Sequence, residues 1–227
     1  MKTPISTPTL SKEAYDTLRR LILSSELQPG ERIIVRELCE NYGLSPTPFK
    51  EALVALERDG LVTSRPRRGY IVANPDPKKI ANVYEIRAVV EGLAARQATE
   101  HRSKALIQSL EKVQQRQREQ WLAEDRLGSG DSDLAFHQLL WTASSNDVLQ
   151  AVAERFSNQA QLIMASVRLR NPQRHEEALD EHDEIIALIA AGHAHQAEEA
   201  MRKHIIRAAM ALRATSPVDP SDVETEK

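Results

Sequence analysis

The sequence predicts a mainly α-helical protein, in which an N-terminal winged helix-turn-helix is followed by an all-helical bundle of about six helices. Helix-favouring residues such as Ala, Leu, Glu, Arg and Gln are abundant, whereas aromatic residues make up 4% of the 227 residues. Near the N-terminus, two short helical patterns meet at a glycine, and two β patterns around a basic turn follow them. Beyond the Pro-rich break at 73–77, apolar residues recur with helical spacing almost to the C-terminus.

Composition excludes several other classes of protein. The mean hydropathy is -0.46, and no apolar run is long enough to span a bilayer. The segment MKTPISTPTL has no apolar core of the length that a signal peptide needs. Cys39 is the only cysteine, so there is no disulfide framework. We therefore expect a cytoplasmic protein without a membrane segment.

The formal net charge of -3 conceals an asymmetry along the chain. Residues 1–75 carry 11 basic and 9 acidic side chains, whereas the whole chain carries 30 and 33. A mildly basic N-terminal part joined to an acidic helical part suits a DNA-binding head on an effector-binding body.

The N-terminal part begins with two predicted helices. Residues 1–10, rich in Thr and Pro, are expected to form a flexible arm. Ser11 is the expected N-cap of a first helix that reaches about Ser25. A second helix is expected over Val35–Tyr42, and Gly43 ends it. Two residues then separate it from a third helix, and such a tight connection predicts a helix-turn-helix.

The third helix and a β-hairpin complete this part. Ser45 is the expected N-cap, Pro46 suits the first helical position, and Gly60 is expected to end the helix in a left-handed turn. Residues 61–63 and 70–72 are then predicted to pair as two short strands. The expected tip of this hairpin carries Arg65, Arg67 and Arg68.

The winged helix-turn-helix, residues 11–73, has the parts that are needed to grip DNA. In this architecture the N-terminal end of the third helix enters the major groove, and a basic wing contacts phosphate or the minor groove. The residues expected to contact DNA are Arg36, Ser45, Thr47, Lys50, Arg67, Arg68 and Gly69. The alternative for the wing is an ordinary solvated loop, since basic tips also occur without a nucleic-acid partner.

The motifs YDTLRRLILSSELQPGERI, VRELCENYGLSPTPFKEAL and LERDGLVTSRPRRGYIV resemble, in this order, the DNA-binding domain of GntR-type bacterial transcription regulators. In that family the third helix usually begins Ser-Arg-Thr-Pro-Val-Arg-Glu-Ala. Here Pro46 and Lys50 replace the two arginines. Proline cannot donate to a base, and lysine lacks the bidentate fork of arginine. The resemblance therefore implies DNA binding, at an operator that differs from the family's common one.

The second part of the chain is predicted to be entirely helical. Residues 74–79 form the expected linker, and residues 80–214 form the expected effector-binding and dimerisation domain. The polar, acidic tail over 215–227 is expected to be disordered. The expected helices are 80–100, 104–125, 132–144, 147–170, 173–191 and 194–214, with a Gly/Ser-rich loop at 127–130 before the third.

Four residues of these helices combine into a candidate metal site. Asp133 and His137 are four residues apart and share one helix face. His182 and His204 occupy apolar registers of two other helices. Burying three imidazoles and a carboxylate without partners would be costly, whereas a divalent metal ion would satisfy all four. The alternatives are hydrogen-bonded core histidines and, for Asp133 with His137, a solvent-exposed ion pair.

The motifs DLAFH, EHDEI and MRKHI make residues 80–212 resemble the helical effector domain of the FadR branch of GntR regulators. The resemblance implies that Asp133, His137, His182 and His204 are metal ligands. The helix count resembles that of the VanR-like subgroup. We expect Zn as the ion, with Ni, Fe or Mn as alternatives.

In this family the metal commonly helps to hold a small carboxylate effector. Arg87 lies near the inward stripe of the first bundle helix and is the first candidate for pairing with that carboxylate. An ion pair with Glu91 is the alternative for Arg87. Gln159, a polar residue on an apolar stripe, is the second candidate.

The sequence thus predicts a homodimeric transcription regulator that binds a palindromic operator and whose bundle binds a metal and a small organic acid. Repression released by the ligand, through movement of the bundle and the linker, is the expected response. The rivals are a metal-dependent enzyme built on the four ligands and a regulator whose bundle only dimerises. The other histidines, expected on the surface, are His101, His175, His193 and His195.

Overall fold

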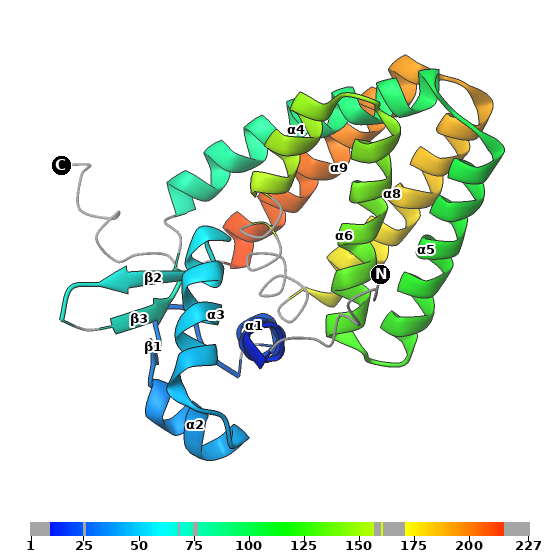
Figure 1. Cartoon of the computed structure of the whole chain (residues 1–227). Coiled ribbons are helices and arrows are strands. Elements are labelled where there is room, and N and C mark those ends of the chain that lie inside the picture. The colour runs from blue at the N-terminus through cyan, green and yellow to red at the C-terminus, as the bar shows by residue number, and fades with distance from the viewer. Residues whose placement is uncertain are drawn as a thin grey trace, which may run out of the picture.

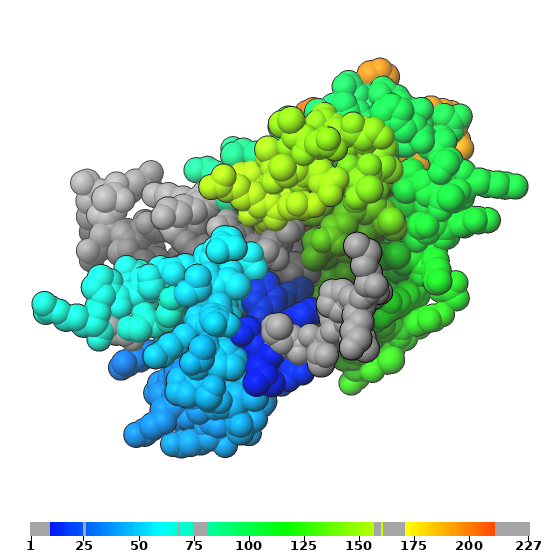
Figure 2. All heavy atoms as spheres, viewed as in Figure 1, coloured from blue at the N-terminus to red at the C-terminus, as the bar shows by residue number. Residues whose placement is uncertain are grey.

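The computed structural model is described for residues 10–24, 26–67, 69–74, 77–156, 160 and 171–215. These residues form a small N-terminal head of helices and a short sheet, and a larger bundle of helices (Figure 1). This mainly helical architecture confirms the fold class that the sequence predicted. The head (blue to cyan) and the bundle (green to orange) adjoin each other in Figure 2.

The helices of the head are α1 (Leu10–Leu23), α2 (Val35–Tyr42) and α3 (Pro46–Arg58). Their apolar faces share one core, in which Leu18, Phe49 and Leu53 are fully buried. Gly43 ends α2 in the left-handed conformation, with φ 68°, as the sequence predicted. The short connection holds α2 and α3 together as a helix-turn-helix.

Two expected helix caps are not formed. Helix α1 already includes Leu10, so Ser11 lies inside the helix and its hydroxyl donates a hydrogen bond to Glu51 instead. Ser45 precedes α3 in an extended conformation, but its side chain accepts no capping hydrogen bond. Pro46 does occupy the first helical position, where no amide N–H is needed.

The wing is an antiparallel sheet with the strand order β1-β3-β2. Its strands are β1 (Arg32–Ile33), β2 (Val62–Arg65) and β3 (Gly69–Val72). Val62 pairs with Val72 and Arg65 pairs with Gly69, so Arg65 lies in a strand and not at the tip, contrary to the sequence prediction. The sequence did not predict β1, because two residues are too few to show a period.

The helices of the bundle are α4 (Pro77–Glu100), α5 (Lys104–Leu122), α6 (Arg126–Ala143), α8 (Pro172–Ala191) and α9 (Ala194–Thr215). Residues 147–156 are helical as well. Helix α4 starts at Pro77, inside the expected linker, because proline is tolerated in a first helical turn. It packs along α9, and α5 packs along α6. None of the described helices combines the length and apolarity needed to cross a bilayer.

Helix α6 begins earlier than the sequence predicted. The Gly/Ser-rich segment 127–130, expected to be a loop, is helical. Asp125 is the N-cap, and its carboxylate accepts a hydrogen bond from the backbone N–H of Gly128 at 2.8 Å. A Cβ atom at Gly128 would collide with Asp125. This glycine therefore serves close packing at the helix start and does not mark a loop.

The start of α6 also meets the head. Leu127 packs against the core of the head. Arg19 of α1 donates a hydrogen bond to the Asp131 carboxylate at 2.9 Å. Figure 1 shows this end of α6 on the side of the bundle that faces α1. One helix thus contacts the N-terminal head and also carries Asp133 and His137 of the candidate metal site.

Candidate metal centre and DNA-binding surface

Three histidines from three helices meet inside the bundle. His137 comes from α6, His182 from α8 and His204 from α9, and they are 3%, 0% and 5% exposed. One nitrogen of each ring lies within 4.8 Å of those of the other two. The fold therefore brings together side chains whose convergence the sequence alone could not demonstrate.

Two of the histidines are held by carboxylates. His137 Nδ1 lies 2.5 Å from Glu91 Oε2, and His204 Nδ1 lies 2.7 Å from Glu181 Oε2. An ionised carboxylate can only accept a hydrogen bond, so His204 Nδ1 carries the proton of its neutral ring. The Nε2 atom of His204 is then left with a lone pair.

Both carboxylates remain ionised at neutral pH. Burial acts to raise the pKa of Glu91, but the charge of Arg87 and the contact with His137 outweigh it and lower the pKa to about 2. Burial also acts to raise the pKa of Glu181. The hydrogen bond from His204 and those from two arginines outweigh it and lower the pKa to about 2.

The third histidine, His182, is held by an amide. Gln114 Nε2 donates to the carbonyl oxygen of Leu179 at 2.6 Å, so Gln114 Oε1 is the acceptor for His182 Nδ1, at 3.3 Å. Burial, followed by repulsion from His204, places the pKa of His182 well below its ordinary value. Burial also lowers the pKa of His204. These rings are therefore neutral, which is the form that binds metal ions.

This arrangement fits a divalent metal ion. His182 Nε2 and His204 Nε2 lie 3.4 Å apart, and two lone pairs at that distance repel each other unless a cation lies between them. Neutral imidazoles are common ligands of Zn²⁺, and hydrogen bonds to their outer nitrogens orient them. Asp133 Oδ1 lies 4.0 Å from His182 Nε2, but Asp133 is not part of the group whose ligand atoms all lie within 4.8 Å of one another, so its role as the fourth ligand stays a prediction.

Asp133 marks the accessible side of the centre. Its side chain is 22% exposed, whereas that of His182 is fully buried. Its Oδ1 atom accepts a hydrogen bond from Gln117 Nε2 at 3.2 Å.

Arg87, the first effector candidate, is engaged by Glu91. Its Nε and Nη2 atoms both lie 2.7 Å from Glu91 Oε1, so the ion pair considered as its alternative is formed. Burial acts to lower the pKa of Arg87, but the Glu91 charge outweighs it and raises the pKa. Glu91 uses two of the five N–H donors of the guanidinium, and a role in holding an effector stays a prediction. Gln159 lies outside the described residues.

Sequence reasoning missed the residues that hold the histidines. Gln114 and Gln117 interrupt the buried stripe of α5 that runs from Leu110 to Trp121. Polar residues in an apolar stripe indicate a buried polar cluster, so this signal was available. The pairing of Glu181 with His204 was not visible, because it depends on how α8 and α9 pack.

His175 is buried, so the expectation that it lies on the surface is wrong. Its Nε2 atom is 2.9 Å from Ser129 Oγ, and its ring stacks on Trp121 with centroids 4.0 Å apart. The early start of α6 places Ser129 inside the bundle, where it can meet this histidine. The other three predicted surface histidines are exposed, namely His101, His193 and His195.

The expected DNA contacts of the helix-turn-helix are exposed. Ser45, Thr47 and Lys50 lie at or just before the N-terminal end of α3, the end that enters the major groove in this architecture. Arg36 lies in the first turn of α2 and forms an exposed ion pair with Glu40 at 3.7 Å. Such a pair is weak and can be exchanged for a phosphate.

At the tip of the wing, the side chain of Arg67 is exposed to solvent. Arg67 is exposed and has a left-handed backbone, with φ 63°. Gly69 follows with φ 75°, a conformation that favours glycine. Arg68 lies outside the described residues. The described part of the tip thus has the exposure that a phosphate or minor-groove contact requires.

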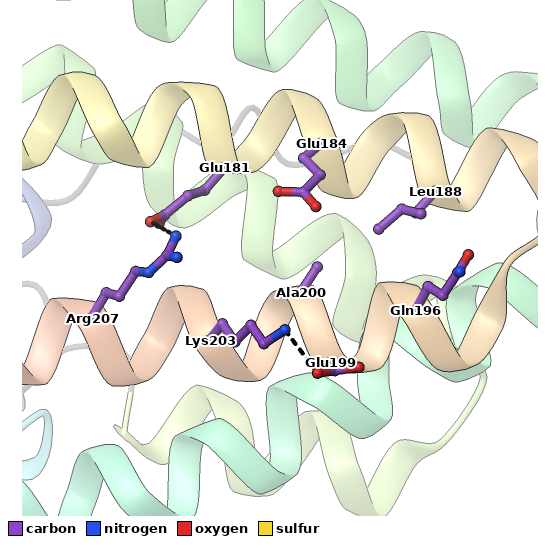
Figure 3. Close-up of a pocket in the computed structure, with 8 residues that line it drawn as sticks. All are labelled: Glu181, Glu184, Leu188, Gln196, Glu199, Ala200, Lys203 and Arg207. Carbon is purple, nitrogen blue, oxygen red and sulfur yellow. Dashed lines mark hydrogen bonds and ion pairs between the residues drawn. The ribbon is translucent and has the colours of Figure 1, made fainter.

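A cavity of about 310 Å³ lies between α8 and α9 on the outside of the bundle (Figure 3). Glu181 lines it and accepts a hydrogen bond from Arg207 at 2.9 Å through Oε1, while its Oε2 contacts His204. Lys203 and Glu199 form a second ion pair in the wall, at 2.7 Å. Glu181 therefore connects this surface with the histidine cluster.

Both parts of the chain match known families. Residues 10–72 match the bacterial regulatory proteins of the gntR family, and residues 82–207 match the FCD domain. The chain belongs to the GntR family and carries an FCD domain. It is therefore a transcription regulator, and GntR regulators bind operator DNA.

Individual relatives agree with this assignment. An uncharacterised HTH-type transcriptional regulator, YdhC of Bacillus subtilis (strain 168), is 27% identical over 200 residues, which cover 85% of this chain and 84% of YdhC. The HTH-type transcriptional repressor RspR of Escherichia coli (strain K12) is 30% identical over 137 residues, or 59% of each chain. The solved structure of E. coli McbR/YncC has 18% identity and a TM-score of 0.77, and covers 92% of this chain and 99% of its own, so it shares the fold. The named regulators are not enzymes.

Proposed function

We propose that the FCD domain of this regulator binds one divalent metal ion, expected to be Zn²⁺, and a small carboxylate effector that modulates operator binding. The observation that carries the proposal is the convergence of His137, His182 and His204, each of which has a carboxylate or amide oxygen beside its Nδ1 atom. Asp133 would be the fourth ligand and would leave further positions for the effector. Ni, Fe or Mn could use the same donors.

The effector carboxylate would bind the metal ion and would also pair with a positively charged side chain. Arg87 is the described candidate, since its guanidinium lies beside Glu91 in the same buried cluster. Gln159 remains the second candidate from the sequence. The Arg87–Glu91–His137 chain supports this assignment, because a change at Arg87 would reach a metal ligand directly.

For operator binding, we infer that Thr47 and Lys50 contact base edges from the N-terminal end of α3. Positioning contacts to the DNA backbone or minor groove would come from Arg36, Ser45, Arg67, Arg68 and Gly69. Because Pro46 and Lys50 replace arginines of the family pattern, the preferred operator should differ from the family's common one. An operator selection that returned the common site unchanged would contradict this inference.

Switching would use the contact between the bundle and the head. Asp133 and His137 lie on α6, and the same helix contacts the head through Leu127 and through the pair of Asp131 with Arg19. A ligand that favours one position of α6 would therefore favour one position of the head and of the linker.

The protein would act as a homodimeric, cytoplasmic repressor. Two-fold symmetry lets two recognition helices read one palindromic site. The name of the relative RspR supports repression, and the helix content supports the VanR-like subgroup. Cytoplasmic location follows from the need to reach chromosomal DNA.

Elemental analysis of the purified, zinc-reconstituted protein tests the metal site. The wild type and His195→Ala, which changes an exposed histidine, should each hold one equivalent of metal per chain. His182→Ala should hold none, and circular dichroism shows whether it has kept its fold. The proposed metal site would be contradicted if the wild type held no stoichiometric metal, or if folded His182→Ala held as much metal as the wild type. Either result would leave the bundle as a dimerisation platform.

Gel shifts with DNA from around its own gene test the coupling. The metal-loaded protein should bind specifically, and a small carboxylate should weaken that complex. The same carboxylate should have no effect after chelation or in His182→Ala. A carboxylate effect that survives chelation would show that the metal plays no part in sensing.

A further inference from the structure

Gln117, beside the histidine cluster, has a buried oxygen atom without a hydrogen-bond partner in the part of the chain that the structure describes. Gln117 of α5 is 0% exposed, and its Nε2 atom donates to Asp133 Oδ1 at 3.2 Å. This bond fixes the orientation of the amide, because a carboxylate only accepts. Gln117 Oε1 must then accept, yet among the described residues no donor lies within hydrogen-bonding distance of it.

The unpartnered acceptor lies close to Asp133, a candidate metal ligand. The two terminal atoms of an amide are about 2 Å apart, which places Gln117 Oε1 within about 6 Å of Asp133 Oδ1. Asp133 is the candidate ligand whose side chain is partly exposed, at 22%. Buried acceptors without donors are rare in proteins, so a group retained here indicates a partner that comes from outside the chain.

We propose that Gln117 makes the effector site selective for carboxylates that also carry a hydroxyl group, such as small hydroxy acids. This inference rests on the proposed metal and carboxylate site. The carboxylate would be held at the metal and Arg87, and its hydroxyl would donate to Gln117 Oε1. An ammonium group is disfavoured as the donor, because a divalent ion bound nearby would repel it.

Matched pairs of acids test the selectivity, with the full-length, zinc-loaded protein and isothermal titration. L-lactate is compared with propionate, and 2-hydroxybutyrate with butyrate, so that each pair consists of monocarboxylates that differ by one hydroxyl. Each hydroxy acid should bind about tenfold tighter than its partner, since the deoxy acid leaves the buried acceptor unpaired. Equal affinities within both pairs would overturn the inference and would indicate that water satisfies Gln117.

Two variants separate recognition from support of the fold. Gln117→Met keeps the length of the side chain and removes the acceptor, so the ratio within each pair should fall towards one. Gln115→Met is the matched control, because Gln115 is exposed on the same helix and bonds to Glu119. A purely structural role of Gln117 would weaken both acids of a pair alike and keep the ratio.

The remaining outcomes distinguish this inference from the proposed function. Zinc binding without binding of either hydroxy acid overturns the role of Gln117 and leaves the metal site intact. Failure to bind zinc overturns both. If Gln117→Met does not fold, equal affinities within the wild-type pairs would still overturn the inference.

Discussion

Replacing Glu181 by glutamine should weaken metal binding without removing a metal ligand. Glu181 Oε2 accepts from His204 Nδ1 and from Arg174, each at 2.7 Å, and its Oε1 accepts from Arg207 at 2.9 Å. A glutamine of the same size has one acceptor oxygen and no charge. If the amide oxygen accepts from His204, the amide nitrogen faces Arg207 and that hydrogen bond is lost. If the amide oxygen faces Arg207 instead, the hydrogen bonds from His204 and Arg174 are lost.

The size of the effect follows from these contacts. Loss of a hydrogen-bonded partner behind a metal-bound histidine typically costs 10- to 100-fold in affinity, or about 1.4–2.7 kcal/mol. Glu181→Gln should therefore raise the zinc dissociation constant by that factor. The apo protein should lose about 1–3 kcal/mol of unfolding free energy, since buried Arg174 loses its carboxylate partner.

Competition with a chromophoric zinc chelator measures the affinity, and denaturant unfolding of the apo protein measures the stability. The matched control is Glu184→Gln, which changes an exposed carboxylate of the same helix in the same surface cavity. It should leave both quantities unchanged. A zinc affinity of Glu181→Gln equal to the wild type would refute the reasoning that Nδ1 partners prepare the histidines for metal.

Three further predictions concern the head and its contact with the bundle. Lys50→Ala should weaken operator binding by about 1–3 kcal/mol, because a base or phosphate contact is lost, and a gel-shift titration at fixed salt measures the change. The control Lys104→Ala, at the start of α5, should leave operator binding unchanged. Asp131→Asn removes an exposed ion pair and should change stability by less than about 1 kcal/mol, yet reduce the effect of a carboxylate on operator binding. An undiminished effector response would rule out this contact as part of the switch. Leu53 is fully buried, so Leu53→Ala should lower the free energy of unfolding by about 2–5 kcal/mol in denaturant unfolding. Val54 is 51% exposed, so the control Val54→Ala should change the free energy of unfolding by about 0.5 kcal/mol or less.

Elements with strong local signals could be predicted from the sequence. The end of α2 at Gly43 and the start of α3 at Pro46 depend on backbone preferences of single residues, and both lie where expected. The start of α6 could not be predicted in this way. Glycine and serine at 127–130 resemble a loop, but the Asp125 cap and the tight packing at Gly128 make them helical.

In the candidate site, too, single residues could be predicted from local sequence, whereas contacts between helices could not. Spacing and apolar register identified Asp133, His137, His182 and His204 one by one. Their approach depends on which helices are neighbours, a property that no single segment encodes. The pairing of His137 with Glu91 and of His204 with Glu181 is of this kind, because each pair joins two helices.

The charges around the histidines indicate what kind of ligand the centre can accept. Each carboxylate behind a histidine has an arginine of its own, since Glu91 pairs with Arg87 and Glu181 pairs with Arg174. These pairs cancel formally, while Arg207, the second arginine on Glu181, has a side chain that is 58% exposed and is screened by water. Asp133 contributes one negative charge. A divalent ion would then leave the centre with one net positive charge, in a buried region where an unbalanced charge is costly. A single carboxylate group restores neutrality, whereas a second one would reverse the sign. The electrostatics therefore favour an effector that places one carboxylate at the metal, and any further polar group of that effector should be neutral, as a hydroxyl facing Gln117 would be.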